Sequence, residues 1–145
     1  MKTLKDLSIH QPFIALFGSG NSVLDLPAED LERIRREAFV VTLNYAPIRL
    51  QSHLNIWSDR RVSEFLEKHY RQHDKDRLLL VRERRATPGL RPIVDFWFNQ
   101  SKENLRGNYT IVWALQLLQK YFPEKTILLF GVDMNAPDQN SAKWY

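Results

Sequence analysis

An apolar run and a polar turn, Phe13-Ile14-Ala15-Leu16-Phe17 and Gly18-Ser19-Gly20-Asn21-Ser22, follow one another near the amino terminus. A short run that is apolar at every position is typical of a strand buried on both faces, as in a parallel sheet. The next segment, residues 27–36, opens with proline, has acids in its first turn and arginines in its last, and so indicates a helix. This stretch therefore predicts a strand, a tight turn and a helix.

The same alternation continues along the chain. Further apolar runs, each predicted to be a strand, cover residues 39–43, 53–57, 78–81, 93–98 and 126–130. Amphipathic segments at residues 60–72 and 108–121 predict two more helices. Such alternation is typical of an α/β fold with a mostly parallel sheet flanked by helices. No repeat or Gly/Ser linker divides the chain, so we predict a single Rossmann-like domain over residues 1–145.

Composition excludes several classes of protein. Apolar residues make up 43% and charged residues 26% of the chain, which is ordinary for a globular domain and excludes a disordered or collagen-like one. Cysteine is absent, so the chain has no disulfide, thiol nucleophile or iron–sulfur cluster. No stretch has the roughly 18 uncharged apolar residues of a membrane span, and the start lacks the apolar core of a secretory signal. We therefore expect a cytoplasmic protein.

The turn at residues 18–22, called the glycine turn below, is the first candidate site, because ligands of parallel α/β folds bind at the carboxyl ends of strands. Its glycines would let backbone N–H groups approach a phosphate; a tight turn without a ligand is the alternative. It is not a P-loop, since no Gly-Lys-(Ser/Thr) tripeptide occurs. It also differs from the nicotinamide-cofactor turn, which needs Gly or Ala where Val23 stands.

Polar residues also follow other predicted strands. Asn44 and Tyr45 follow the second strand, where an amide beside an aromatic ring suits a base or a ribose, or where Asn44 is an ordinary turn residue. A dinucleotide enzyme would have an acid at Asn44, so we do not expect NAD. Asp59 and Asp133 follow the third and sixth strands. Carboxylates at strand ends suit a general base or a divalent cation, or serve as turn residues.

Two further groups of residues have a local pattern that suits an anion. Gly107 and Asn108 open the last predicted helix, where Asn108 either caps the helix or faces the same cleft as the glycine turn. Four arginines share one predicted loop: Arg82, Arg84, Arg85 and Arg91. Arginine clusters suit phosphates, but aromatic residues do not interleave with these, so we expect a solvated loop rather than a nucleic-acid interface. The four histidines lack metal-motif spacing, and we assign no metal ligands.

In order and spacing, these motifs resemble the bacterial sialyltransferases of glycosyltransferase family 42 and the related hydroxymethylpterin pyrophosphokinase-like domain proteins. Residues 17–23 are similar to the family's Gly-Asn-Gly-Pro-Ser-Leu turn, and residues 42–45 to its second-strand asparagine. Residues 107–133 resemble its glycine-started helix, its strand and its Gly-(Ile/Val)-Asp motif.

The resemblance implies a nucleotide-sugar donor, such as a CMP-sugar, a glycan acceptor, and inverting glycosyl transfer without a metal. It also implies that the nucleotide is contacted by Ser19, Ser22, Asn44 and Asn108. Asp133 would lie toward the sugar or the phosphate.

The chain departs from the family in ways that bear on catalysis. Ser19 and Asn21 replace the Asn and Pro of the family's turn. The family's catalytic histidine lies beyond the Gly-(Ile/Val)-Asp strand, whereas the twelve residues from Met134 to Tyr145 include no histidine.

We therefore expect Asp59 or Asp133 as the only available bases, and weak or absent transfer. One alternative is Mg²⁺-dependent pyrophosphokinase-like phosphoryl transfer. The other is a domain that binds a nucleotide or a glycan without turnover. The oligomeric state, homo-oligomers included, is left open.

Overall fold

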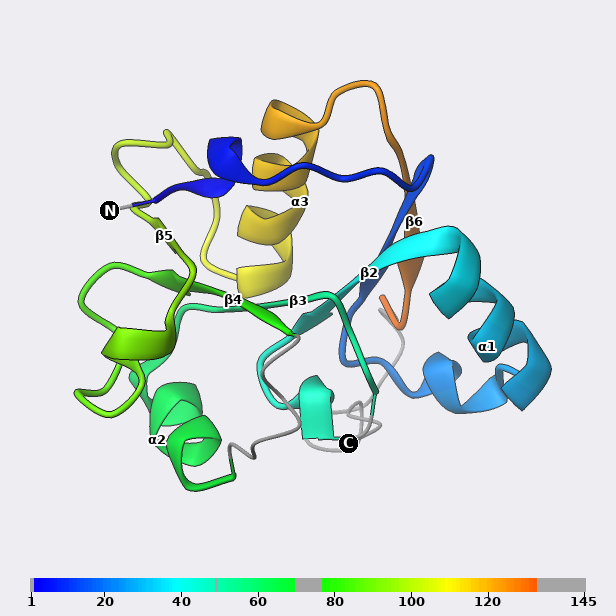
Figure 1. Cartoon of the computed structure of the whole chain (residues 1–145), viewed down its shortest axis with the longest axis horizontal. Coiled ribbons are helices and arrows are strands. Elements are labelled where there is room, and N and C mark those ends of the chain that lie inside the picture. Colours follow the sequence, from blue (N-terminus) through cyan, green and yellow to red (C-terminus); the bar gives the residue numbers. More distant parts are fainter. Residues whose placement is uncertain (1, 49, 70–76, 133–145) are drawn as a thin grey trace.

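The computed structural model describes residues 2–48, 50–69 and 77–132, and these contain one parallel sheet with the strand order β5-β4-β3-β2-β1-β6 (Figure 1). The strands are β1 (Phe13–Phe17), β2 (Ala38–Leu43), β3 (Leu54–Trp57), β4 (Leu78–Arg82), β5 (Phe96–Phe98) and β6 (Thr126–Phe130). The α-helices are α1 (Ala28–Glu37), α2 (Arg60–His69) and α3 (Thr110–Tyr121). Every neighbouring pair of strands is parallel, which confirms the predicted α/β fold.

Two predicted boundaries are wrong for identifiable reasons. The first part of the predicted strand 93–98 is not a strand: Ile93 ends a 3₁₀ turn (Arg91–Ile93), and only Phe96–Phe98 pairs with β4. α3 begins at Thr110 instead of Asn108, because Gly107 has a φ of +86° and Tyr109 is still extended. α2 is described as far as His69, and residues 70–72 of its predicted range lie outside the described residues.

The direction in which strands are added to the sheet reverses at β1. Strands β2 to β5 follow one another on one side of β1, whereas β6 pairs with its other side. Because crossovers between parallel strands are right-handed, opposite directions place their helices on opposite faces. Figure 1 shows this arrangement, with α3 and the short 3₁₀ turn Leu4–Asp6 on one side of the sheet and α1 and α2 on the other.

Both faces of the central strands are buried, as their apolar sequences predict. On one face, Ala114 and Leu117 of α3 pack with Ile14 and Leu16 of β1. On the other face, two clusters lie under α1 and α2, and they are built on Phe17 of β1 and Val81 of β4, among others. No helix among the described residues is long and apolar enough to cross a membrane.

Candidate functional site at the carboxyl edge of the sheet

The first turn of α3 lies across the carboxyl edge of the sheet and contacts residues that end or follow three strands. A Cβ at Gly18, after β1, would lie 3.0 Å from Ile111 Cδ1. The Oγ1 of Thr110 lies 2.7 Å from the Oγ of Ser58, which follows β3. Further along the helix, the ring of Trp113 lies under the guanidinium of Arg82, the last residue of β4. α3 therefore joins the strand ends at which a ligand of this fold would bind.

Backbone contacts with β6 fix the glycine turn. The N–H of Gly18 donates to the carbonyl of Phe130 at 2.7 Å, and that of Gly20 to the carbonyl of Gly131 at 2.6 Å. A Cβ at Gly18 would lie 2.7 Å from the oxygen of Gly131, so a side chain does not fit there. Gly131 has a φ of +69°, which favours glycine. These glycines bring the ends of β1 and β6 together, and two of the turn's amides are used within the protein.

The remaining members of the turn lie at the surface. Ser19 is half-buried, and Asn21 and Ser22 are exposed. The turn leads into a five-residue 3₁₀ helix, Asn21–Asp25, and only then toward α1. Side chains of the turn, rather than the amino terminus of α1, are therefore the groups that a bound ligand would meet.

Asn44 is held at the end of β2 by a buried polar network. It has a left-handed φ of 53°, its N–H donates to Ile56, and its carbonyl accepts a 3.2 Å hydrogen bond from the Asn55 side chain. The Oδ1 of Asn55 accepts a 3.0 Å hydrogen bond from Thr42, whose hydroxyl also lies 2.8 Å from that of Ser52. This network was not predicted, although Thr42 and Asn55, two polar residues within apolar strands, are the signal for it.

Tyr45 and Asp59 belong to the α2 side of this edge. The Tyr45 ring meets Phe65 edge-on at 4.9 Å between centroids. Burial raises the pKa of Tyr45, and the nearby negative charge of Asp59 raises it further. Asp59 is exposed, and its Oδ1 accepts the N–H of Arg61 at 2.8 Å, which caps the start of α2. Asp133, the other predicted base, lies outside the described residues.

The segment before α3 is tied to the helix by two of the helix's own side chains. Trp113 Nε1 donates to the carbonyl of Gly107 at 2.9 Å, and the Gln116 amide bonds both the N–H and the carbonyl of Arg106. Asn108 is exposed and does not cap the helix; Tyr109 occupies the N-cap position without a side-chain cap. The alternative in which Asn108 caps the helix is therefore wrong, while its role as a ligand contact stays a prediction.

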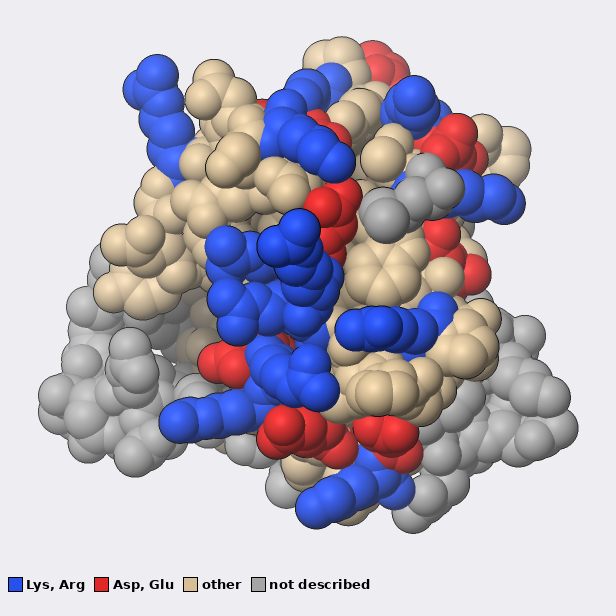
Figure 2. Space-filling view, turned by 90° about the vertical axis from the view of Figure 1, so that its left-hand side faces the viewer, with Lys and Arg blue, Asp and Glu red and all other residues tan. Residues whose placement is uncertain are grey.

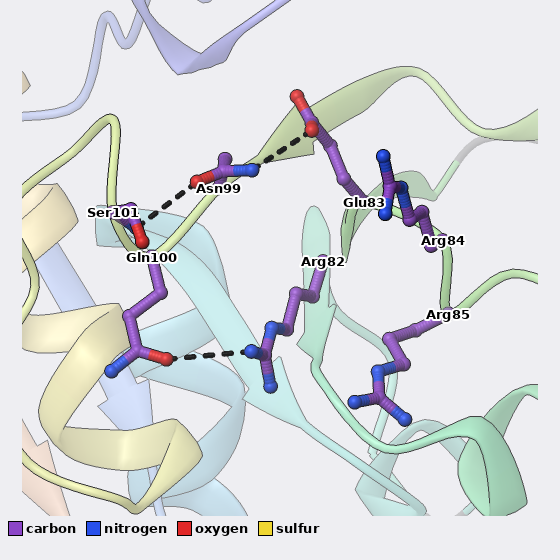
Figure 3. A pocket seen from close by; sticks show the side chains of 7 residues that line it. All are labelled: Arg82, Glu83, Arg84, Arg85, Asn99, Gln100 and Ser101. Atoms are coloured by element: carbon purple, nitrogen blue, oxygen red, sulfur yellow. Dashed lines mark hydrogen bonds between the residues drawn. The ribbon is translucent and has the colours of Figure 1, made fainter.

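A second feature of the carboxyl edge is a polar pocket at the ends of β4 and β5 (Figure 3). It has a volume of about 390 Å³ and is lined by Arg82, Glu83, Arg84, Arg85, Asn99, Gln100 and Ser101. Three of the four arginines that were predicted to lie in a solvated loop therefore line one concave site. The sequence could not show this, because the loop after β5 that completes the pocket comes near only through strand pairing.

The structure thus gathers the glycine turn, Asn44 and Ser58 at the ends of three adjacent strands, and places the arginine pocket two strands away from β2. In the described part of the chain, no group of three or more His, Asp and Glu residues could hold a metal ion.

Comparisons of the chain with protein-family models, curated proteins and solved structures found no match. Function must therefore be argued from the site itself.

Proposed function

We propose that this chain is a sialyltransferase-like domain that binds a nucleotide or nucleotide-sugar across the carboxyl ends of β1, β2 and β3. One observation carries the proposal: the glycine turn lies where the strand order reverses, with α1 and α3 on opposite faces. In open parallel sheets, the crevice outside the carboxyl ends at such a reversal is where ligands bind.

Asn44 is the residue best placed to recognise the nucleotide. Within the described part of the chain, its side-chain amide makes no hydrogen bond, while its backbone is held by Ile56 and Asn55. A polar group that is already fixed costs little ordering entropy when a ligand arrives. The amide both donates and accepts, so it suits the edge of a base or the hydroxyls of a ribose.

Glycosyl transfer would need a base that removes the proton of the acceptor hydroxyl while the nucleotide phosphate leaves. Asp59 is the candidate within the described residues, but it is exposed and already accepts the N–H of Arg61. A carboxylate in water that caps a helix lacks the burial that usually tunes a general base. Binding is therefore the main function we propose, with slow transfer or none.

The test is a thermal-shift and calorimetric panel of CMP, UDP, GDP and ATP, each with and without Mg²⁺. We expect CMP to bind without the metal. Asn44→Ala should weaken this binding by roughly 1–3 kcal/mol, as for a lost buried hydrogen bond. A strict requirement for Mg²⁺ would instead favour the pyrophosphokinase-like alternative.

Asn104 provides a matched control. It has a φ of 54°, almost that of Asn44, but lies in the loop between β5 and α3. Asn104→Ala therefore repeats the backbone strain of Asn44→Ala without touching the proposed site. If the two variants bind CMP equally well, or if the native chain binds no nucleotide saturably, the proposal is wrong.

A further inference from the structure

We infer that the pocket at the ends of β4 and β5 binds the oxyanion group of a small molecule, a phosphate or a carboxylate. The pocket begins at the end of β4, and two strands separate β4 from β1. At the usual strand spacing of about 4.8 Å, the pocket lies roughly 14 Å from the glycine turn. It is a second site, separate from the proposed nucleotide site.

Within the described residues, no carboxylate neutralises the arginines of the pocket. Helical arginines elsewhere in the described chain form ion pairs, namely Arg33–Glu37, Arg35–Glu32 and Arg60–Glu64. No ion pair among the described residues involves Arg82, Arg84 or Arg85. Glu83, the one acid that lines the pocket, accepts a hydrogen bond from Asn99 at 3.0 Å and lies 3.6 Å from Lys102. Three positive charges thus share a hollow with one engaged negative charge.

Arg82 is held in position for a ligand. It is half-buried, its guanidinium lies 5.2 Å from the centre of the Trp113 ring, and one nitrogen donates to Gln100 Oε1 at a long 3.4 Å. Trp113 is itself buried and anchored to Gly107. A guanidinium fixed on an aromatic face keeps further N–H donors for two parallel hydrogen bonds to an oxyanion.

Hydrogen bonds from within the turn and from α2 hold the turn that follows β4. The N–H of Arg85 donates to the carbonyl of Arg82 at 3.1 Å, and the carbonyl of Arg85 accepts the Ser63 hydroxyl at 2.6 Å. The same hydroxyl accepts the indole N–H of Trp57. Arg84, which lies in this turn, has a φ of +66°, a value that residues other than glycine and asparagine rarely adopt. Figure 3 shows the guanidinium groups of Arg82 and Arg85 on one side of this turn.

The surroundings and the size of the pocket favour a small anion. Figure 2 faces the side of the molecule where β5 lies in Figure 1, and lysine and arginine side chains gather in its centre. Such a gathering raises the local concentration of anions. The volume of about 390 Å³ is that of a small-molecule pocket rather than of a flat nucleic-acid surface.

The experiment measures binding of pyrophosphate and of citrate to the full chain by calorimetry at fixed ionic strength, with inorganic phosphate as a third anion. We expect saturable binding, and the preference between pyrophosphate and citrate identifies phosphate or carboxylate as the group recognised. Arg82→Gln should weaken binding tenfold or more. Arg82→Lys, which keeps the charge but not the planar fork, should restore only part of it.

Two further variants keep the test decisive. Arg85→Gln changes an exposed side chain, so it preserves the fold even if Arg82→Gln does not, and it should also weaken binding. Arg33→Gln removes the same charge from an exposed arginine of α1 and should leave binding unchanged. The inference is overturned if neither anion binds saturably, or if Arg33→Gln weakens binding as much as the pocket variants do.

A single-stranded oligonucleotide serves as the last probe. If it binds more tightly than pyrophosphate and is weakened equally by Arg82→Gln and Arg33→Gln, the arginines belong to a nucleic-acid surface and the inference is wrong. The nucleotide proposal fails separately, because it is tested by Asn44→Ala against Asn104→Ala. If the nucleotide proposal fails, the inference of anion binding in the arginine pocket is unaffected.

Discussion

The glycine turn and the arginine turn of residues 82–85 follow parallel strands of one sheet, yet they are closed in different ways. After β1, the turn is held by backbone hydrogen bonds: the N–H groups of Gly18 and Gly20 donate to the carbonyls of Phe130 and Gly131 at the end of β6. After β4, Glu83 likewise donates to Phe98 at the end of the neighbouring strand, and Arg85 donates to Arg82 within the turn. Here side chains add to the backbone contacts: the Ser63 hydroxyl donates to the carbonyl of Arg85, and the Trp113 ring lies under the guanidinium of Arg82.

The two turns show that a sequence motif can arise from packing as well as from ligand binding. A glycine-rich turn suggests a phosphate site, but here the glycine at position 18 is explained by the close approach of β1 to the end of β6. An arginine-rich loop suggests a solvated surface, but here its charges line a hollow with no carboxylate paired to them among the described residues. Arg82 is half-buried and has no carboxylate partner among the described residues, so an anion would replace part of the hydration it has lost. Such a charge points more directly to binding than glycine does.

The largest effect we expect would break the first turn. Gly18→Ala places a Cβ 2.7 Å from the Gly131 carbonyl oxygen and 3.0 Å from Ile111. The oxygen cannot retreat easily because it belongs to the backbone, whereas the Cδ1 of Ile111 ends a side chain that can move. We expect a loss of about 3 kcal/mol in the free energy of unfolding, as for a severe overpacking substitution, measured by urea denaturation.

Gly89→Ala is the matched control for this change. The nearest atoms to a Cβ at Gly89 belong to the outer part of the Glu67 side chain, which is exposed and flexible. Its effect should stay within about 0.5 kcal/mol, as for most surface substitutions. Similar losses in the two variants would mean that the contact between the ends of β1 and β6 is not what the glycine turn is built for.

The next effect concerns Trp113, which connects α3 to the arginine turn. Trp113→Phe removes the indole N–H that bonds Gly107 but keeps an aromatic face under Arg82. Trp113→Leu removes both. We expect Trp113→Phe to cost about 2 kcal/mol of stability, with Trp113→Leu costing more, since both leave a smaller side chain in the core.

Binding of pyrophosphate then separates the two variants. The phenylalanine variant should retain most of the affinity, because the guanidinium still lies on a ring, whereas the leucine variant should lose severalfold. Calorimetry on the folded fraction of each variant checks this. Equal affinities would show that Arg82 is not positioned by the aromatic face.

Some of this structure was accessible from the sequence because it is local. The runs that became β1 and β6 are apolar at nearly every position, and their ends agree with the prediction. The start of α3 was misplaced because Gly107 takes a left-handed φ and its carbonyl bonds Trp113, which lies six residues further along. Helix propensity and capping rules do not include such a contact.

The parts that could not be predicted depend on strand order. Periodicity shows that a strand exists but not which strand it pairs with, so nothing in the sequence brings Arg82 beside Gln100. The same holds for the contact of Gly18 with Gly131, which are more than a hundred residues apart. Asn55 was a missed signal of another kind, because a polar residue that is fully buried in an apolar strand needs partners.

The smallest effect we expect is one of pH, and it arises at the opposite edge of the sheet from both turns. His53 precedes β3, its Nδ1 accepts the N–H of Val40 at 2.8 Å, and its ring stacks on Phe39. Burial, together with the charge of Arg35, lowers the pKa of His53 below its usual 6.5. The unfolded chain therefore takes up this proton first as the pH falls.

The sign of the effect follows from that order of protonation. His53 contributes its full stabilisation above the unfolded pKa of 6.5, and the contribution is lost as the pH falls from there toward the lower pKa of the folded state. His53→Asn keeps an acceptor for Val40 without a titrating ring, so its stability should depend less on pH between about 7.5 and 5.5. His10→Asn, at an exposed histidine, should keep the native pH dependence. Urea denaturation at several pH values checks both variants, and equal slopes for the two would show that His53 is not the responsible group. If the native slope disappears only in His53→Asn, the pH dependence of stability belongs to the amino edge of the sheet.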